Sequence, residues 1–112
     1  MITGSDGDWI WLSHEEEPGY EITGKYLFFS EDKNKLIEIA KNEIMNLHFH
    51  KAKVSEVAPD GLTDHVLCLY YKDDSRKYEL AKRNELKYNV KFRYWKREEG
   101  TPGYANTPGN FK

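Results

Sequence analysis

Hydrophobic and polar positions alternate in residues 48–57 and 90–96, and a period of two residues is typical of β-strands. Two further stretches are also predicted as strands: residues 8–13, in which Trp9 and Trp11 share a face, and Gly24–Ser30, which is rich in aromatic residues. A fifth stretch, His65–Tyr71, is almost continuously apolar, as in a strand that is buried on both faces. The pattern therefore predicts five strands.

Two stretches between these strands have helical spacing instead. In the first, from Ser30 to about residue 46, the apolar stripe consists of Leu36, Ile37, Ala40, Ile44 and Leu47. Ser30 is its expected N-cap. The second begins at a cap, Asp73 or Asp74, and runs to about residue 87. Its inward-facing residues are Tyr78, Ala81 and Leu86.

The element order β-β-α-β-β-α-β predicts an α+β fold. We expect a single curved sheet, mixed or mainly antiparallel because several links are short, with two helices on one face. The other face is then left exposed or curved around a ligand. The chain of 112 residues makes one domain. Its expected core covers about residues 8–104, with flexible ends at 1–7 and 105–112.

Composition limits the class of protein. No apolar run is long enough to span a bilayer, and the first residues are polar and acidic rather than signal-like. The single cysteine, Cys68, lies among Val66, Leu67, Leu69 and Tyr70, which predicts a buried thiol without an internal disulfide partner. These features favour a reducing, cytoplasmic location and no membrane partner.

The net charge of −2 conceals a gradient along the chain. Residues 1–32 contain eight acidic and one basic side chain, whereas residues 72–97 contain ten basic and four acidic ones. The basic half can attract a phosphate-bearing partner, or it can pair with the acidic N-terminal segment. Binding of duplex nucleic acid is not favoured, because that function usually needs a net basic domain.

The last predicted strand carries the strongest chemical signal. Strict alternation places Lys91, Arg93, Trp95 and Arg97 on one face and Phe92, Tyr94 and Lys96 on the other. Cations beside a flat ring suit a ligand that is both anionic and planar, such as a nucleotide or a phosphopeptide. In the alternative reading, the cations are solvated and the aromatic rings fill the core.

An ordered set of short motifs resembles a known family. The motifs are Trp9-x-Trp11, Gly24-Lys25-Tyr26-Leu27-Phe28-Phe29, Ala52-Lys53-Val54-Ser55, residues 66–70, and Tyr94-Trp95-Lys96 followed by Thr101, Gly103 and Tyr104. The chain resembles the phosphothreonine lyase domain proteins related to the basophilic-leukaemia-expressed protein. That family is similar in fold to the cap-binding translation initiation factor, which has a curved sheet backed by helices.

The resemblance implies a phosphate site on the sheet. Lys53 matches the lysine that removes the α proton in the bacterial lyases, and Lys25 matches a phosphate-binding lysine. Arg93, Lys96 or Arg97 matches a phosphate-holding arginine. The lyases place their general-acid histidine two residues after the strand lysine, where this chain has Leu27. Phosphate binding is therefore better supported than phosphate elimination.

Other residues complete the candidate site. His50 is a second candidate for the missing general acid. His48 and His50 share a strand face, but no third ligand follows at a suitable spacing, so we expect neither a metal nor a cofactor. Thr101 and Tyr104 carry hydroxyl groups that can donate to phosphate. The candidate stacking surfaces, each of which can equally be core, are Trp9, Trp11 and Trp95.

The sequence favours a small domain that binds a phosphate-bearing small molecule or phosphopeptide. The predicted binding residues are Lys25, Lys53, Arg93, Lys96, Arg97, Thr101, Tyr104, Trp9, Trp11 and Trp95. One alternative is a lyase with Lys53 as general base and His50 as acid. Another is a protein-interaction module that uses the acidic loop at residues 15–17 to contact a protein partner.

Overall fold

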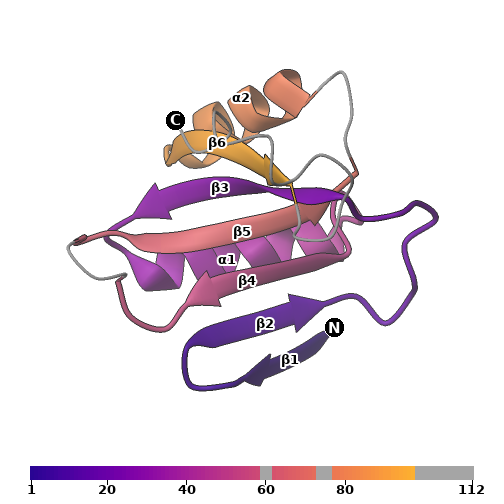
Figure 1. The fold of residues 1–112 in the computed structure, drawn as a ribbon, viewed down its shortest axis with the longest axis horizontal. Coiled ribbons are helices and arrows are strands. Elements are labelled where there is room, and N and C mark those ends of the chain that lie inside the picture. The colour runs from indigo at the N-terminus through magenta and orange to yellow at the C-terminus, as the bar shows by residue number, and fades with distance from the viewer. Residues whose placement is uncertain (59–61, 73–76, 98–112) are drawn as a thin grey trace.

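The computed structural model describes residues 1–58, 62–72 and 77–97 of the chain. Six strands and two helices follow one another along these residues (Figure 1). In chain order they are β1 (Ile2–Ser5), β2 (Trp9–Ser13), β3 (Gly24–Ser30), α1 (Lys33–Met45), β4 (Lys51–Ser55), β5 (His65–Tyr71), α2 (Lys77–Tyr88) and β6 (Lys91–Arg97).

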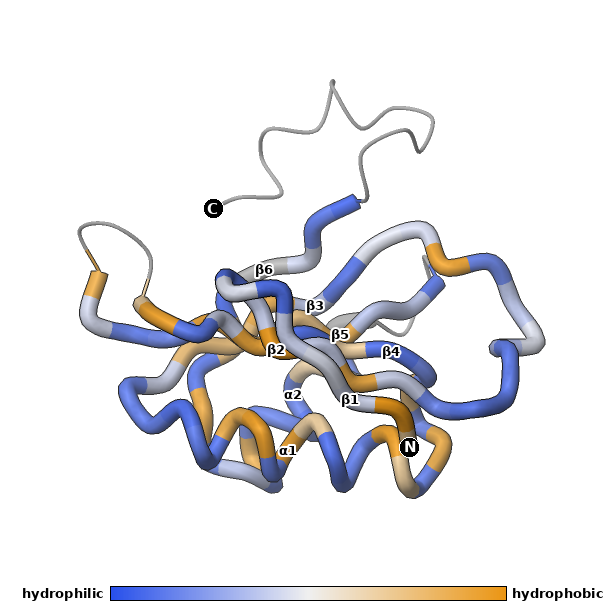
Figure 2. The backbone as a smooth tube through the Cα atoms, turned by 90° about the horizontal axis from the view of Figure 1, so that it is seen from below, coloured by the Kyte–Doolittle hydropathy of each residue, from blue (hydrophilic) through white to orange (hydrophobic). Residues whose placement is uncertain are grey.

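The strands form one sheet in the order β1-β2-β4-β5-β3-β6, and every neighbouring pair is antiparallel. Strands β3 and β4 are therefore parallel to each other, with β5 between them, and α1 connects them. Strands β5 and β6 are related in the same way through α2, with β3 between them. This double split β-α-β arrangement places both helices on one side of the sheet (Figure 2). The predicted α+β class is confirmed.

The main core lies between the sheet and the helices. Tyr26 and Phe28 alternate along β3 and both point into this core, where they meet Leu36 and Ile44 of α1. Helix α1 begins at its N-cap Asp32, whose carboxylate accepts a hydrogen bond from the backbone N–H of Lys35 at 3.1 Å. The predicted cap was Ser30, two residues earlier.

The first strand was not predicted, and it lies within the N-terminal segment that was expected to be outside the core. Strand β1 forms a hairpin with β2 around a tight turn at residues 6–8. Gly7 has a φ of 95° there, a left-handed conformation that glycine adopts at little cost. The carboxylate of Asp6 accepts hydrogen bonds from the backbone N–H groups of Asp8 and Trp9 at 3.0 and 2.8 Å. These bonds fix the turn.

Strand β6 does not alternate strictly, which corrects the predicted faces. Its register against β3 shifts between Leu27 and Phe28, so that Phe92 and Trp95 both pack into the main core. The indole of Trp95 lies over Gly24. A Cβ atom at Gly24 would be 2.7 Å from the carbonyl oxygen of Lys96 and at least as close to that indole, which requires glycine at this position.

Three further expectations are corrected or remain untested. The third predicted strand begins at Lys51 rather than at residue 48, because His48 lies in the turn after α1 and contacts Glu43. Leu86 of α2 and Leu47 are exposed, Leu86 to 82%, so neither belongs to an inward stripe. The predicted caps of α2, the side chain of Tyr78 and the C-terminal tail lie outside the described residues.

Candidate ligand-binding site

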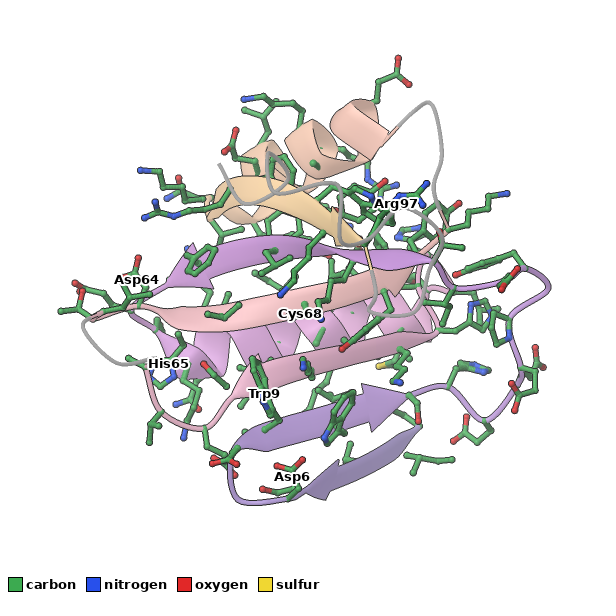
Figure 3. All side chains as sticks on the ribbon, in the orientation of Figure 1. Asp6, Trp9, Asp64, His65, Cys68 and Arg97 are labelled. Carbon is green, nitrogen blue, oxygen red and sulfur yellow. The ribbon has the colours of Figure 1, made fainter. Side chains whose placement is uncertain are left out.

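The face of the sheet opposite the helices carries a second, smaller hydrophobic cluster, and Figure 3 looks onto this face. Its buried members are Leu27, Phe29, Val66, Cys68 and Tyr70, from the neighbouring strands β3 and β5. Side chains at alternate positions of these strands point away from the helices. Because both sets of positions are apolar in β3 and β5, these strands contribute to a hydrophobic cluster on each face of the sheet. No helix covers this open face in the described part of the chain.

The register arranges the open face in rows that run across the strands. The central row joins Trp11 of β2 to Lys53 of β4, then to Cys68 and Leu27. The row on one side is mainly apolar and includes Trp9, Val66 and Phe29. The row on the other side is mainly cationic and includes Lys51, Tyr70, Lys25 and Lys96. The face thus changes from apolar to positively charged along the strand direction.

A pocket of about 300 Å³ opens where these rows meet. Its apolar lining comes from Leu27, Phe29, Leu62, Val66, Cys68 and the ring of Trp9. Its polar lining comes from Lys25, Lys53 and Lys96, on three different strands. The volume is at the lower end of the range for small-molecule sites, about 300–1,000 Å³. The pocket therefore combines an apolar floor with three cations.

The lysines of the open face lie over aromatic rings. The Nζ atom of Lys53 is 3.9 Å from the centroid of the Trp9 ring. The Nζ atom of Lys51 is 4.9 Å from the centroids of both Trp11 and Tyr70. Such cation–π contacts contribute about 0.5–1 kcal/mol each at exposed sites, and they hold the ammonium groups above the sheet.

Two of the pocket lysines occupy an unfavourable pair of positions. Lys25 of β3 and Lys96 of β6 are direct cross-strand partners on the open face. Like charges at such positions destabilise a sheet, by up to about 1 kcal/mol. Lys53 lines the same pocket, so three positive charges share one small volume.

The indole of Trp11 is fixed by a third hydrogen bond to the Asp6 carboxylate in the β1–β2 turn. Its Nε1 atom donates to the carboxylate of Asp6 at 3.1 Å, and its ring stacks on Tyr70 with the centroids 6.2 Å apart. Hydrogen bonds hold the pKa of Asp6 below its usual value; the bond from Trp11 has the largest effect, and those from the Trp9 and Asp8 amides have smaller ones. The hairpin that contains β1 therefore positions an aromatic ring at the edge of the pocket.

The structure brings together four of the predicted binding residues, since Trp9, Lys25, Lys53 and Lys96 all line the pocket. Trp11 lies beside it. Arg93 lies on the same face, with its guanidinium 5.0 Å from the ring centroid of Phe29, a lining residue.

Other predicted binding residues lie elsewhere. Trp95 is only 5% exposed and belongs to the main core on the opposite face, so it cannot act as a stacking surface there. Arg97 pairs with Gly24 at the end of β6 and does not line the pocket. Thr101 and Tyr104 lie outside the described residues.

His50 is not placed to act with Lys53. Its ring packs edge-on against Tyr20 and His14 beside the start of β4, and its Nδ1 atom is 3.4 Å from the Tyr20 hydroxyl. The pKa of Tyr20 is raised to about 12, mainly by burial and to a smaller extent by the neighbouring Tyr71. No histidine is among the residues that line the described pocket.

Lys51 and Tyr70 belong to the open face but were not predicted as site residues. The alternation of Lys51 with Lys53 indicated a shared strand face, yet only the strand order reveals that Trp11 and Tyr70 flank Lys51. Leu62 also lines the pocket, from a loop whose sequence carries no strand or helix signal.

The described residues contain no group of three histidine, cysteine, aspartate or glutamate side chains that could hold a metal ion. Neither described helix is long and apolar enough to cross a membrane. The chain matches no protein-family model, no curated protein and no solved structure. The resemblance to the lyase-domain family therefore stays a prediction, and the function has to be argued from the pocket itself.

Proposed function

We propose that the open face of the sheet binds a ligand in which a phosphate group is attached to a planar or apolar part, as in a nucleotide or a phosphopeptide. The observation that carries this proposal is a single pocket with an apolar floor and three lysines from three strands, Lys25, Lys53 and Lys96. Charge-assisted hydrogen bonds from lysine to phosphate are short and strong, and clustered lysines provide several of them.

The arrangement of the pocket favours an amphipathic ligand over free phosphate. An inorganic ion would contact the lysines and leave the floor around Leu27 and Val66 unused. A planar or apolar group attached to the phosphate can lie on this floor beside Trp9, where burial contributes about 25 cal/mol per Å² of apolar surface removed from water. Both halves of the pocket are then used by one molecule.

Binding is better supported than elimination of phosphate. A lyase needs a base to remove the α proton and an acid to protonate the departing phosphate. Lys53 is present in the pocket, but the position of the expected acid is Leu27, and His50 packs against Tyr20 instead. The lyase alternative therefore lacks half of its chemistry among the described residues.

The proposal is tested by calorimetric titration with adenosine monophosphate and with a phosphothreonine peptide. The pocket variant is Lys25→Ala/Lys53→Ala, and its matched control is Lys41→Ala/Lys82→Ala, which removes the same charge from the two helices. We expect the pocket variant to bind the preferred compound at least about 100-fold more weakly, since each of the two lost charged hydrogen bonds costs about 1.5–3 kcal/mol. The control should bind like the unmodified protein.

Equal affinity in the pocket variant and the unmodified protein would refute the proposal. Equal weakening in both variants would also count against it, because the attraction would then be a property of net charge rather than of the pocket. Mass analysis of the phosphothreonine peptide after incubation separates binding from catalysis. An intact peptide supports binding alone.

A further inference from the structure

The pairing of a cation with an aromatic ring at the pocket is repeated further along the same face. In the first tier, Lys53 lies over Trp9, with 3.9 Å between Nζ and the ring centroid. In the second tier, Lys51 lies 4.9 Å from the centroids of Trp11 and Tyr70, and these two rings stack with an interplanar angle of 23°. Each tier pairs a lysine of β4 with a tryptophan of β2, and the second tier adds Tyr70 of β5. The tiers adjoin, because the Nζ atom of Lys53 is also 5.2 Å from the centroid of Trp11.

The spacing of the tiers is set by the strand geometry. Trp9 and Trp11 are two residues apart on β2, as Lys51 and Lys53 are on β4. Two residues of a strand span about 6.6–6.8 Å. Stacked bases of a duplex strand rise by only about 3.4 Å per nucleotide. The tiers therefore suit neighbouring nucleotides whose bases are pulled apart from one another rather than stacked in a helix.

A ligand with one phosphate uses only part of this surface. A mononucleotide or a phosphopeptide side chain would occupy the pocket of the first tier and would not contact Trp11 and Lys51 of the second tier. A duplex hides the faces of its bases, so flat rings on a sheet cannot stack on them. Proteins that bind single strands combine a positively charged track for the backbone with exposed aromatic rings for successive bases, and several do so on an open sheet.

We infer that the open face binds a short stretch of single-stranded nucleic acid, with adjacent bases at the Trp9 and Trp11 tiers and the phosphates along Lys25, Lys51 and Lys53. This inference rests on the proposed phosphate-binding function and names its ligand class. It also gives a role to β1, since the turn residue Asp6 accepts the indole hydrogen bond that holds Trp11 in place.

Binding requires the lysine side chains to move. The ammonium groups of Lys51 and Lys53 lie over the rings on which bases would stack. A base that approaches such a ring displaces the ammonium group, and the flexible four-carbon side chain can carry it to the adjacent phosphate. The cation–π contact is thereby exchanged for base stacking and a charged hydrogen bond. In the absence of ligand, the same contact keeps the cations near the binding face.

The inference is tested by the dependence of affinity on oligonucleotide length. The intact chain is titrated with adenosine monophosphate and with single-stranded adenylate oligomers of about two, four and eight nucleotides, and tryptophan fluorescence is followed. We expect affinity to rise about tenfold from the mononucleotide to the dinucleotide, since stacking on one further aromatic ring stabilises a bound base appreciably. The logarithm of the binding constant should fall with the logarithm of salt concentration with a slope of about −2 for three phosphate contacts.

Variants of the second tier separate the two levels of the proposal. Lys51→Gln and Trp11→Leu should each weaken the tetranucleotide about tenfold and leave the mononucleotide within about twofold, whereas Lys41→Gln on α1 should change neither. Thermal unfolding of each variant checks that the sheet is intact, and Lys51→Gln remains informative if Trp11→Leu does not fold.

Each result has a distinct meaning. Equal affinity for one and for four nucleotides would overturn this inference and leave the phosphate-binding proposal standing. Tighter binding of a phosphothreonine peptide or of a duplex than of any single strand would also overturn it. If none of these compounds binds, both proposals are wrong.

Discussion

Replacing Glu43 should destabilise the protein more than any other single acidic side chain of the helices. Glu43 lies on α1 and is fully buried, with 0% of its surface exposed. One carboxylate oxygen accepts a hydrogen bond from the Tyr88 hydroxyl at 2.8 Å, and the other accepts one from Arg83 at 3.1 Å. His48 and Lys87 also lie within 4 Å of the carboxylate. This single side chain therefore connects α1 to Arg83 and Tyr88 in the C-terminal half of α2.

The size of the effect follows from these contacts. The hydrogen bond from the part-buried Tyr88 hydroxyl to a carboxylate contributes about 2 kcal/mol. The pairs with Arg83 and Lys87 contribute about 0.5 kcal/mol each, because those side chains are 41% and 46% exposed and water screens them. Glu43→Ala should therefore lower the free energy of unfolding by about 3 kcal/mol, or the Tm by about 13 °C for a chain of this length.

Thermal unfolding followed by circular dichroism measures this shift. The matched control is Glu38→Ala on the same helix, where the carboxylate is 68% exposed and lies 3.9 Å from Lys41. An exposed pair of this kind contributes little, so the control should melt within about 2 °C of the unmodified protein. If Glu43→Ala melted as close to the unmodified protein as the control does, the buried carboxylate would not be what joins the two helices.

Three further predictions concern the sheet and its loops. Gly24→Ala should cost about 2 kcal/mol or more in unfolding by urea, because its Cβ would overlap the indole packed on it, whereas Gly19→Ala, with open space around the new atom, should change little. The pKa of Tyr20 is raised to about 12, so the stability that its neutral hydroxyl contributes is present below pH 10 and lost as the pH rises toward 12. The Tm should therefore fall in this alkaline range, and Tyr20→Phe should make that fall smaller. The pKa of Asp6 is lowered instead, so its contribution is present above about pH 4 and lost in acid. Asp6→Ala should remove that acid dependence and shift the fluorescence of Trp11, whereas unchanged spectra would contradict the role of the turn.

Local pattern was enough to predict the buried strands. Strands β3 and β5 were predicted at their observed bounds because aromatic and β-branched residues fill both of their faces. Strand β1 was missed because its residues are all exposed and carry no hydrophobic alternation. The Asp6-Gly7 pair was the available signal, since this dipeptide favours the tight turns that join antiparallel strands.

The faces of β6 could not be predicted, since they depend on a partner strand. A register shift against Leu27 and Phe28 places Trp95 in the core and moves Arg93 and Lys96 to the open face. Nothing local to residues 91–97 marks this irregularity, because bulges are set by the pairing of two strands. The alternation of residues 91–97 therefore predicted a strand correctly and placed Trp95 on the wrong face of it.

The meeting of the lysines depends on strand order in the same way. Lys25 and Lys96 become neighbours only because the second split β-α-β unit inserts β3 between β5 and β6, and Lys53 joins them across β5. Aromatic rings on the uncovered face are costly to leave in contact with water. The meeting of lysines and aromatic rings around one pocket is the physical basis for proposing a ligand site on this face rather than on the helical side.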